Sequence, residues 1–235
     1  MRIYGAGSLD DIKACSDLGV TGILTNPQGF DQYYRGEMTL EEITVAIAET
    51  TDLPAFIQIH GPTTEVLVER ARKLNAIAPD RIGFKVIADP KGFRAIRVLQ
   101  LEGIDCIATA LFSVAQASIA STVGAFGICP FVSRARSIGL DPHVIISDIR
   151  AGYDRLIAVG IDAPEIIAVS LHGVEDVELS IRAGADAVAM RYPLIEEMMK
   201  HSLSDKAEAL FAKNWANVRG EDVSYLRTDV SGDAE

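Results

Sequence analysis

The chain has 235 residues, which suits one α/β barrel better than two ordinary domains, because such barrels begin at about 200 residues. Hydrophobic residues make up 49% of the chain and charged residues 23%, which excludes a disordered or fibrous protein. With 33 acidic and 22 basic residues the net charge is −11. This argues against nucleic acid or an anionic membrane as a partner, since both require a surplus of Lys and Arg.

The sequence carries no targeting or metal signature. Residues 1–5 contain no apolar signal region, and no stretch reaches the roughly 18 continuous apolar residues of a membrane span. Cys15, Cys106 and Cys129 lie in apolar stretches without metal-ligand spacing, so we interpret them as reduced core thiols. These features predict a cytoplasmic protein with no cofactor and no metal.

Short apolar runs alternate with longer amphipathic segments almost from one end of the chain to the other. The runs are nearly continuous in apolar residues, as expected for a parallel sheet covered by helices. Eight such runs favour a closed (β/α)8 TIM barrel over an open doubly wound sheet, and no Gly-x-Gly-x-x-Gly sequence follows the first run. The predicted strands are residues 2–6, 22–25, 55–60, 82–88, 106–111, 127–132, 166–171 and 187–192.

Capping signals predict where helices begin and end between these strands. Ser8 and Thr39 each stand three residues before an acidic residue, which is the capping-box spacing. Thr63 is the predicted cap of a helix that runs to residue 78. Three glycines follow helical stretches and suit the left-handed position that ends a helix, namely Gly19, Gly103 and Gly184.

The last 43-residue segment, 193–235, follows the eighth predicted strand. We predict a barrel over 1–192, a C-terminal helical extension over 193–227 and a disordered tail over 228–235. The apolar residues of 204–218 form one helical stripe. It fits either a helix folded on its own barrel or an oligomerisation arm that packs on a neighbouring subunit. The stripe consists of Ala207, Leu210, Phe211, Trp215 and Val218.

Lys85 lies within the otherwise apolar run 82–88. A charged amine there is costly unless it is paired or deprotonated. Burial lowers the pKa of an amine and makes it the neutral nucleophile that a Schiff-base lysine must be. The alternative is an ordinary lysine at a strand end, whose ammonium group reaches solvent or a carboxylate.

Polar or aromatic side chains stand at a similar depth in the strands around Lys85, namely Gln58, Thr109 and Phe131. Barrel enzymes place their chemistry at the C-terminal ends of the strands, so we interpret these residues as one pocket, although each alone could be an ordinary core residue. Alternation puts His60 on the same face as Gln58 and nearer the mouth. A neutral imidazole there could act as a base, and a structural histidine is the alternative.

Five segments together resemble the small transaldolases and fructose-6-phosphate aldolases: residues 25–27 (Thr-Asn-Pro), 84–86 (Phe-Lys-Val), 92–103, 108–117 and 130–134. The resemblance covers residues 1–218. It implies a Schiff-base enzyme that cleaves or forms the C3–C4 bond of a ketose and transfers or releases a dihydroxyacetone unit. It also implies a ketose or ketose phosphate and an aldehyde as substrates, and a homo-oligomer, a pentamer or decamer.

The resemblance assigns roles to individual positions. Lys85 would be the nucleophile, and Gln58 and Thr109 would move protons through water. The fructose-6-phosphate aldolases also carry a glutamine at the position of Gln58, whereas the transaldolases carry a phenylalanine at the position of Phe131. Arginine and serine side chains after strands six and seven would hold a phosphate. The implied or candidate substrate-binding residues are Thr25, Asn26, Phe131, Arg134, Ser170, His172 and Arg191.

The first strand departs from the family, which has an aspartate where this chain has Ala6. Asp10 and Asp11 belong to the first helical turn, so neither obviously replaces it. Three hypotheses follow. They are a transaldolase-like or fructose-6-phosphate aldolase-like enzyme, a Schiff-base carbon–carbon lyase for a different carbonyl substrate, and a non-catalytic barrel that binds a sugar phosphate.

Overall fold

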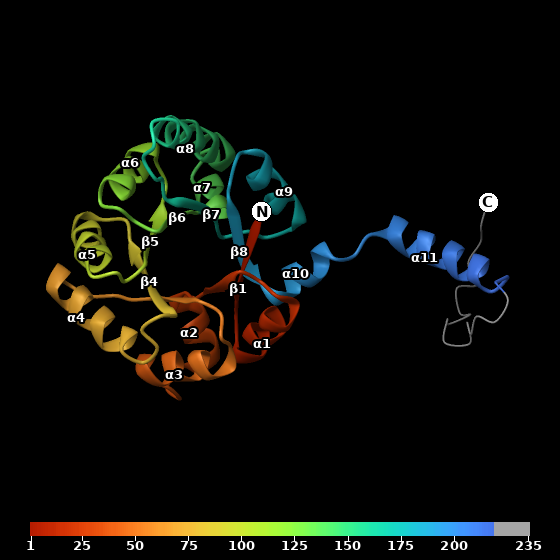
Figure 1. Ribbon diagram of the computed structural model, residues 1–235, viewed down its shortest axis with the longest axis horizontal. Coiled ribbons are helices and arrows are strands. Elements are labelled where there is room, and N and C mark those ends of the chain that lie inside the picture. Colours follow the sequence, from red (N-terminus) through yellow and green to blue (C-terminus); the bar gives the residue numbers. More distant parts are fainter. Residues whose placement is uncertain (219–235) are drawn as a thin grey trace. The chain divides into compact units, whose positions relative to one another are not determined.

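Eight parallel strands close into a barrel in sequence order, from β1 to β8 and back to β1, with helices outside them (Figure 1). The computed structural model describes residues 1–218. The closed order confirms the predicted (β/α)8 barrel. The strands are β1 Arg2–Ala6, β2 Gly22–Leu24, β3 Ala55–Gln58, β4 Ile82–Ile87, β5 Cys106–Leu111, β6 Gly127–Pro130, β7 Glu165–Ala168 and β8 Ala187–Arg191.

Six of the predicted strands continue too far at their C-terminal ends; only β1 and β5 end where predicted. Some residues beyond the strand ends still donate one hydrogen bond to a neighbouring strand, such as Thr25 N–H to the Phe56 carbonyl and Ile59 N–H to the Lys85 carbonyl, but the regular pairing has ended before them. Val132, predicted as strand, already belongs to a helix, and Tyr192 begins another. β7 also begins one residue earlier than predicted, at the buried Glu165.

The predicted capping chemistry is confirmed. Ser8 with Asp11 and Thr39 with Glu42 form complete capping boxes, and Thr63 caps the fourth helix, which ends at Asn75 and not at residue 78. The helices are α1 Leu9–Leu18, α2 Pro27–Tyr34, α3 Leu40–Thr50, α4 Thr64–Asn75, α5 Pro90–Leu101, α6 Val114–Thr122, α7 Val132–Ser137, α8 Pro142–Ile157, α9 Val174–Arg182, α10 Tyr192–Met198 and α11 Ser202–Trp215.

A charged network occupies the N-terminal end of the barrel interior. The Tyr4 hydroxyl donates to Glu165 Oε2 at 2.8 Å, and Arg2 Nε lies 2.9 Å from Glu165 Oε1. Burial raises the pKa of Glu165, while Tyr4 and Arg2 act in the opposite direction. Above this network, a cluster of side chains that includes Phe56, Ile107 and Ile167 fills the barrel. Chemistry is therefore left to the opposite, C-terminal end.

The chain divides into two compact units, Met1–Ile195 and a second unit from Glu196 onward. α11 contains the first four residues of the predicted apolar stripe, and Val218 follows it. The oligomerisation arm over 193–227 stays a prediction; residues 219–227 and the predicted disordered tail, 228–235, lie outside the described residues. No helix within residues 1–218 has both the length and the apolar content to span a membrane.

Candidate active site

Lys85 lies inside the barrel, on β4, beside Gln58 of β3 in the strand register. Its side chain is only 4% exposed, and its Nζ donates a hydrogen bond to the carbonyl oxygen of Thr25 at 3.0 Å. Burial lowers the pKa of Lys85 from its ordinary value, and only the neighbouring Cys129 acts in the opposite direction. The amine thus has a carbonyl acceptor, which needs no positive charge on the donor.

Thr25 positions this acceptor. Its hydroxyl donates to the Phe56 carbonyl at 3.2 Å and accepts from the Gln58 N–H at 2.9 Å, which ties the end of β2 to β3. We predicted Thr25 as a substrate-binding residue. In the structure its hydroxyl is already hydrogen-bonded to the neighbouring strand β3. The next residue, Asn26, is exposed, and its side-chain oxygen caps α2 by accepting from Gly29 N–H at 2.7 Å. Its amide NH2 group donates no hydrogen bond found within residues 1–218.

Thr109 and Cys129 are register partners on β5 and β6, and both are fully buried. Thr109 Oγ1 has no hydrogen-bond partner within the described part of the chain. Burial raises the pKa of the Cys129 thiol to about 11, with the charge of Lys85 acting in the opposite direction. The cysteines are free and buried as predicted. Sequence reasoning nevertheless missed that Cys129 lies beside Lys85, although its spacing from Phe131 places both on the inner face.

Two residues other than glycine adopt the left-handed conformation within residues 1–218, and both lie at C-terminal strand ends. Ala110 has φ 57° at an irregularity between β5 and β6, and Ser170 has φ 61° just after β7. Such backbone costs of order 1–3 kcal/mol and persists where the surroundings hold it, often at functional sites. The strained positions therefore coincide with the end of the barrel that carries the predicted pocket.

An aromatic and cationic group borders the mouth at β6. Phe131 packs against the barrel core and lies edge-on to Phe112, with ring centroids 5.8 Å apart. The guanidinium carbon of Arg134 lies 5.4 Å from the centre of the Phe131 ring, a cation–π arrangement. Arg134 itself is exposed, so its donors remain available to an anion.

Asp176 organises the neighbouring loop after β7. It accepts from the His172 backbone N–H at 2.9 Å and from Arg136 Nη2 at 2.7 Å. Burial alone would raise the pKa of Asp176, but these hydrogen bonds outweigh it and hold the pKa below its ordinary value. Ser133 binds the Ser170 carbonyl through its N–H and its hydroxyl, at 3.0 and 2.6 Å. The backbone of the predicted Ser170 is thus bound to Ser133, the neighbour of Arg134 in the sequence, and the His172 side chain is exposed.

His60 is not brought to Lys85 by any interaction within the described residues. β3 ends at Gln58, and His60 is exposed beyond it, with its carbonyl accepting from Arg70 at 2.5 Å. Arg191, at the end of β8, is exposed as well and contacts Tyr33 of α2. No hydrogen bond or ion pair found within residues 1–218 links Arg191 to the residues around Arg134, so its role as a phosphate ligand stays a prediction.

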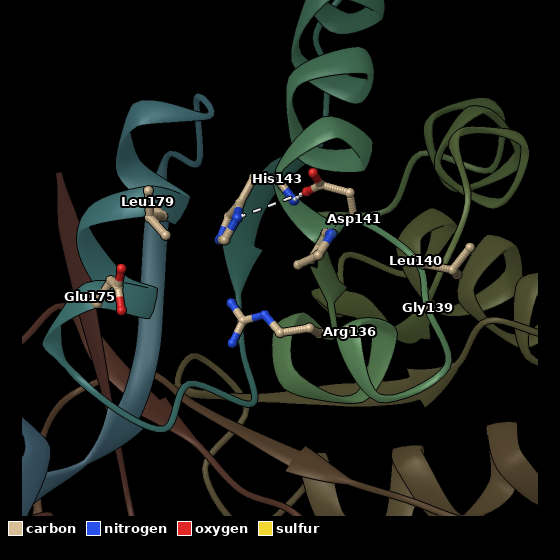
Figure 2. A pocket seen from close by; sticks show the side chains of 8 residues that line it. Arg136, Gly139, Leu140, Asp141, His143, Glu175 and Leu179 are labelled. Carbon is tan, nitrogen blue, oxygen red and sulfur yellow. Dashed lines mark hydrogen bonds and ion pairs between the residues drawn. The ribbon is translucent and has the colours of Figure 1, made fainter.

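A separate pocket of about 550 Å³ lies between α7, α8 and α9 (Figure 2). Arg136 and His143 point into it, with Glu175 across from them, and His143 is paired with Asp141 at 3.9 Å. None of the predicted site residues lines this pocket. We therefore place the candidate active site at the barrel mouth around Lys85.

The buried amine has a consequence for stability. We expect Lys85→Met to raise the free energy of unfolding at pH 7 by about 1–3 kcal/mol, because it removes a polar group from an apolar interior. The pKa of Lys85 is lowered by folding, so the unfolded chain binds more protons between the two pKa values and wild-type stability rises with pH there. The difference in free energy of unfolding between Lys85→Met and wild type should therefore decrease as the pH rises toward the ordinary pKa of lysine.

Urea unfolding of both proteins across this pH range measures the effect. Lys13→Met, which removes an exposed ammonium on α1, is the matched control and should change stability little. A Lys85→Met protein less stable than wild type at every pH would contradict the argument.

Sequence comparison identifies relatives over nearly the whole chain. A family model described as transaldolase/fructose-6-phosphate aldolase matches residues 6–225. A "Probable transaldolase" of Streptococcus equi subsp. zooepidemicus (strain MGCS10565) is 32% identical over 213 residues, which are 90% of this chain and 96% of that protein. A "Probable transaldolase" of Streptococcus pyogenes serotype M5 (strain Manfredo) is also 32% identical, over 88% of this chain and 94% of that protein.

Solved structures resemble the chain in fold alone. A flavocytochrome b2 with sulfite bound superposes with a TM-score of 0.57 at 12% identity, over 80% of this chain and 56% of that one. Mandelate oxidase with (S)-2-phenylpropionate has a TM-score of 0.56 at 15% identity, over 81% of this chain and 64% of that one. At such identities the likeness carries the barrel architecture and no chemistry.

Proposed function

Because the chain belongs to the transaldolase/fructose-6-phosphate aldolase family, we propose that it acts on a ketose or ketose phosphate through a Schiff base on Lys85. The family makes it an enzyme of the transaldolase or aldolase kind, so the non-catalytic barrel is not retained. The observation that carries the proposal is the burial of Lys85, whose amine meets a carbonyl oxygen and no carboxylate within residues 1–218.

In the proposed reaction, neutral Lys85 attacks the C2 carbonyl carbon, and the resulting carbinolamine loses water to give an iminium ion. The C3–C4 bond then breaks. Its electrons pass to the iminium as an enamine, while the C4 hydroxyl loses its proton and C4 leaves as an aldehyde. The enamine attacks an acceptor aldehyde or takes up a proton, and water releases the product from the lysine.

Proton transfer to and from the carbinolamine is proposed for Gln58 and Thr109, acting through water. The unpartnered and buried Thr109 hydroxyl supports this role, since a polar group without a partner is costly unless a ligand or water binds it. His60 remains a prediction for the base. Arg134 and Ser170, with the His172 side chain nearby, are proposed to hold a phosphate group. Asn26 is proposed to bind a substrate hydroxyl through its free amide NH2 group.

Ala6 favours a second candidate, a Schiff-base carbon–carbon enzyme for a different carbonyl compound, because this position lacks the family's aspartate. Full activity with fructose 6-phosphate would exclude it. The predicted homo-oligomer and cytoplasmic location stay predictions.

Borohydride trapping tests the proposal. Reduction of the iminium by hydride gives a stable secondary amine, so intact-mass and peptide analysis should find one ketose-derived adduct on the peptide that contains Lys85. Dihydroxyacetone and fructose 6-phosphate are the two probes, with borohydride alone as the blank. A folded protein that yields no adduct, or an adduct on another lysine, would overturn it.

A further inference from the structure

Arg191 lies on the inner face of β8 at the mouth of the barrel. Ala187 and Ala189 belong to the cluster inside the barrel, so the alternation of the strand directs Arg191 to the same face, above Ala189. In the register with β1, Arg191 is the direct partner of Ala6. The cation is thus next to the position where the family's aspartate is absent.

The side chain of Arg191 extends across the end of β1. Its Nη1 donates to the hydroxyl oxygen of Tyr33 at 3.2 Å, and Tyr33 belongs to α2, which follows β2. Since β1 lies between β8 and β2 in the closed order, this hydrogen bond passes over the end of β1, where Ala6 is located. None of the ion pairs found in residues 1–218 involves Arg191. Its charge is therefore not neutralised by an acidic side chain of the described chain.

The inner face at this end of the barrel is free of acidic residues among those described. The strand register places Ala6, Gln58, Lys85, Thr109, Phe131, Val169 and Arg191 on this face. The nearest acidic residues after β1 and β4, Asp11 and Asp89, accept hydrogen bonds from the backbone N–H groups of Ser8 and Gly92 at the starts of α1 and α5. The buried acid of the interior, Glu165, lies at the other end and is bound by Tyr4 and Arg2. In a chain with a net charge of −11, a mouth with Arg191 on one wall and Arg134 near another is a local site for anions.

The two arginines are in different positions relative to Lys85. β4 and β8 are four strands apart in both directions around the barrel, so Lys85 and Arg191 project from opposite walls. Arg134, in α7 after β6, lies between them around the rim. A substrate whose carbonyl carbon is at Lys85 can therefore meet one cation on the β6 side and a second one across the mouth.

We propose that Arg191, together with the Tyr33 hydroxyl, binds an anionic group on the donor half of the substrate, a carboxylate or a phosphate. An acidic ketone is then a better donor than the neutral dihydroxyacetone unit that fructose 6-phosphate supplies. Guanidinium groups bind both kinds of oxyanion through paired N–H donors, and the tyrosine hydroxyl adds a further donor. This inference rests on the proposed imine at Lys85.

Imine trapping with matched donors tests it. Dihydroxyacetone is the neutral probe, dihydroxyacetone phosphate the phosphate probe and hydroxypyruvate the carboxylate probe, each titrated with borohydride present. We expect the wild-type protein to be half-modified at a lower concentration of one anionic probe than of dihydroxyacetone. Arg191→Gln should raise that concentration at least tenfold more for the anionic probe than for the neutral one, and Tyr33→Phe should do so to a smaller extent. Which anionic probe responds identifies the group as carboxylate or phosphate.

Arg155→Gln, which removes a charge from the exposed end of α8, is the control and should leave the preference intact. The inference is overturned if Arg191→Gln affects all probes equally, or if the neutral probe modifies wild-type protein as readily as both anionic ones. No adduct with any probe would overturn the proposed function as well. An adduct with unaltered preference in Arg191→Gln would overturn this inference alone.

Discussion

Replacing Lys85 by Met is expected to abolish carbon–carbon bond cleavage, with a loss of at least about 10⁴-fold in turnover, as is typical when a covalent nucleophile is removed. Methionine has a similar length and fits the apolar interior, but it has no amine to attack a carbonyl carbon. The borohydride adduct should disappear together with activity. Aldehyde release from fructose 6-phosphate and intact-mass analysis measure the two effects on the same samples.

Lys85→Arg is the companion variant, because it keeps a basic group at the position while its guanidinium stays protonated and is a poor nucleophile. It should be as inactive as Lys85→Met. Lys13→Met should retain full turnover. If Lys85→Met keeps its fold, as judged by circular dichroism, and keeps more than a tenth of the wild-type turnover, Lys85 is not the nucleophile.

Ala6→Asp is expected to raise the rate of fructose 6-phosphate cleavage by about 10²-fold, within the usual contribution of a positioned general base. Ala6 is on the inner face at the end of β1, and none of the inner-face strand positions at that end within residues 1–218 is acidic. A carboxylate introduced there would accept the proton that the C4 hydroxyl must lose. It would also lie beside Arg191, so the preference for an anionic donor should weaken.

Ala6→Asn distinguishes the effect of a basic carboxylate from the effect of a larger side chain, since asparagine has nearly the same shape as aspartate but is not a base. It should leave cleavage close to the wild-type rate. Steady-state turnover at saturating fructose 6-phosphate distinguishes the variants. An Ala6→Asp protein that still forms the Lys85 adduct without faster cleavage would show that the missing aspartate does not limit the reaction, and would favour a different carbonyl substrate.

Most of the fold was predictable because the relevant forces act over short stretches of chain. Apolar runs separated by amphipathic segments follow from burial on both sides of a parallel sheet, and capping boxes satisfy the free N–H groups of the first helical turn. Strand ends were less predictable. Val132 and Tyr192 are apolar enough for a strand, and only the structure shows that a helix begins at each of them.

The candidate site was likewise predictable only in the part that depends on local sequence. Lys85 could be identified from the sequence because a lysine within an apolar run has a large desolvation cost wherever the run is buried. The partners of Lys85 could not. Its hydrogen-bond acceptor is the carbonyl of Thr25, 60 residues earlier, and the thiol of Cys129 appeared to be an ordinary core group.

The sequence by itself determined the eight strands, the helix caps and the presence of one amine that is costly to bury. Only the tertiary structure decided which side chains share a site. Closing the barrel brings β8 beside β1, so that Arg191 meets Ala6 in the register and Tyr33 at a separation of 158 residues. No local pattern encodes such a contact, because it arises from the closure of the whole sheet.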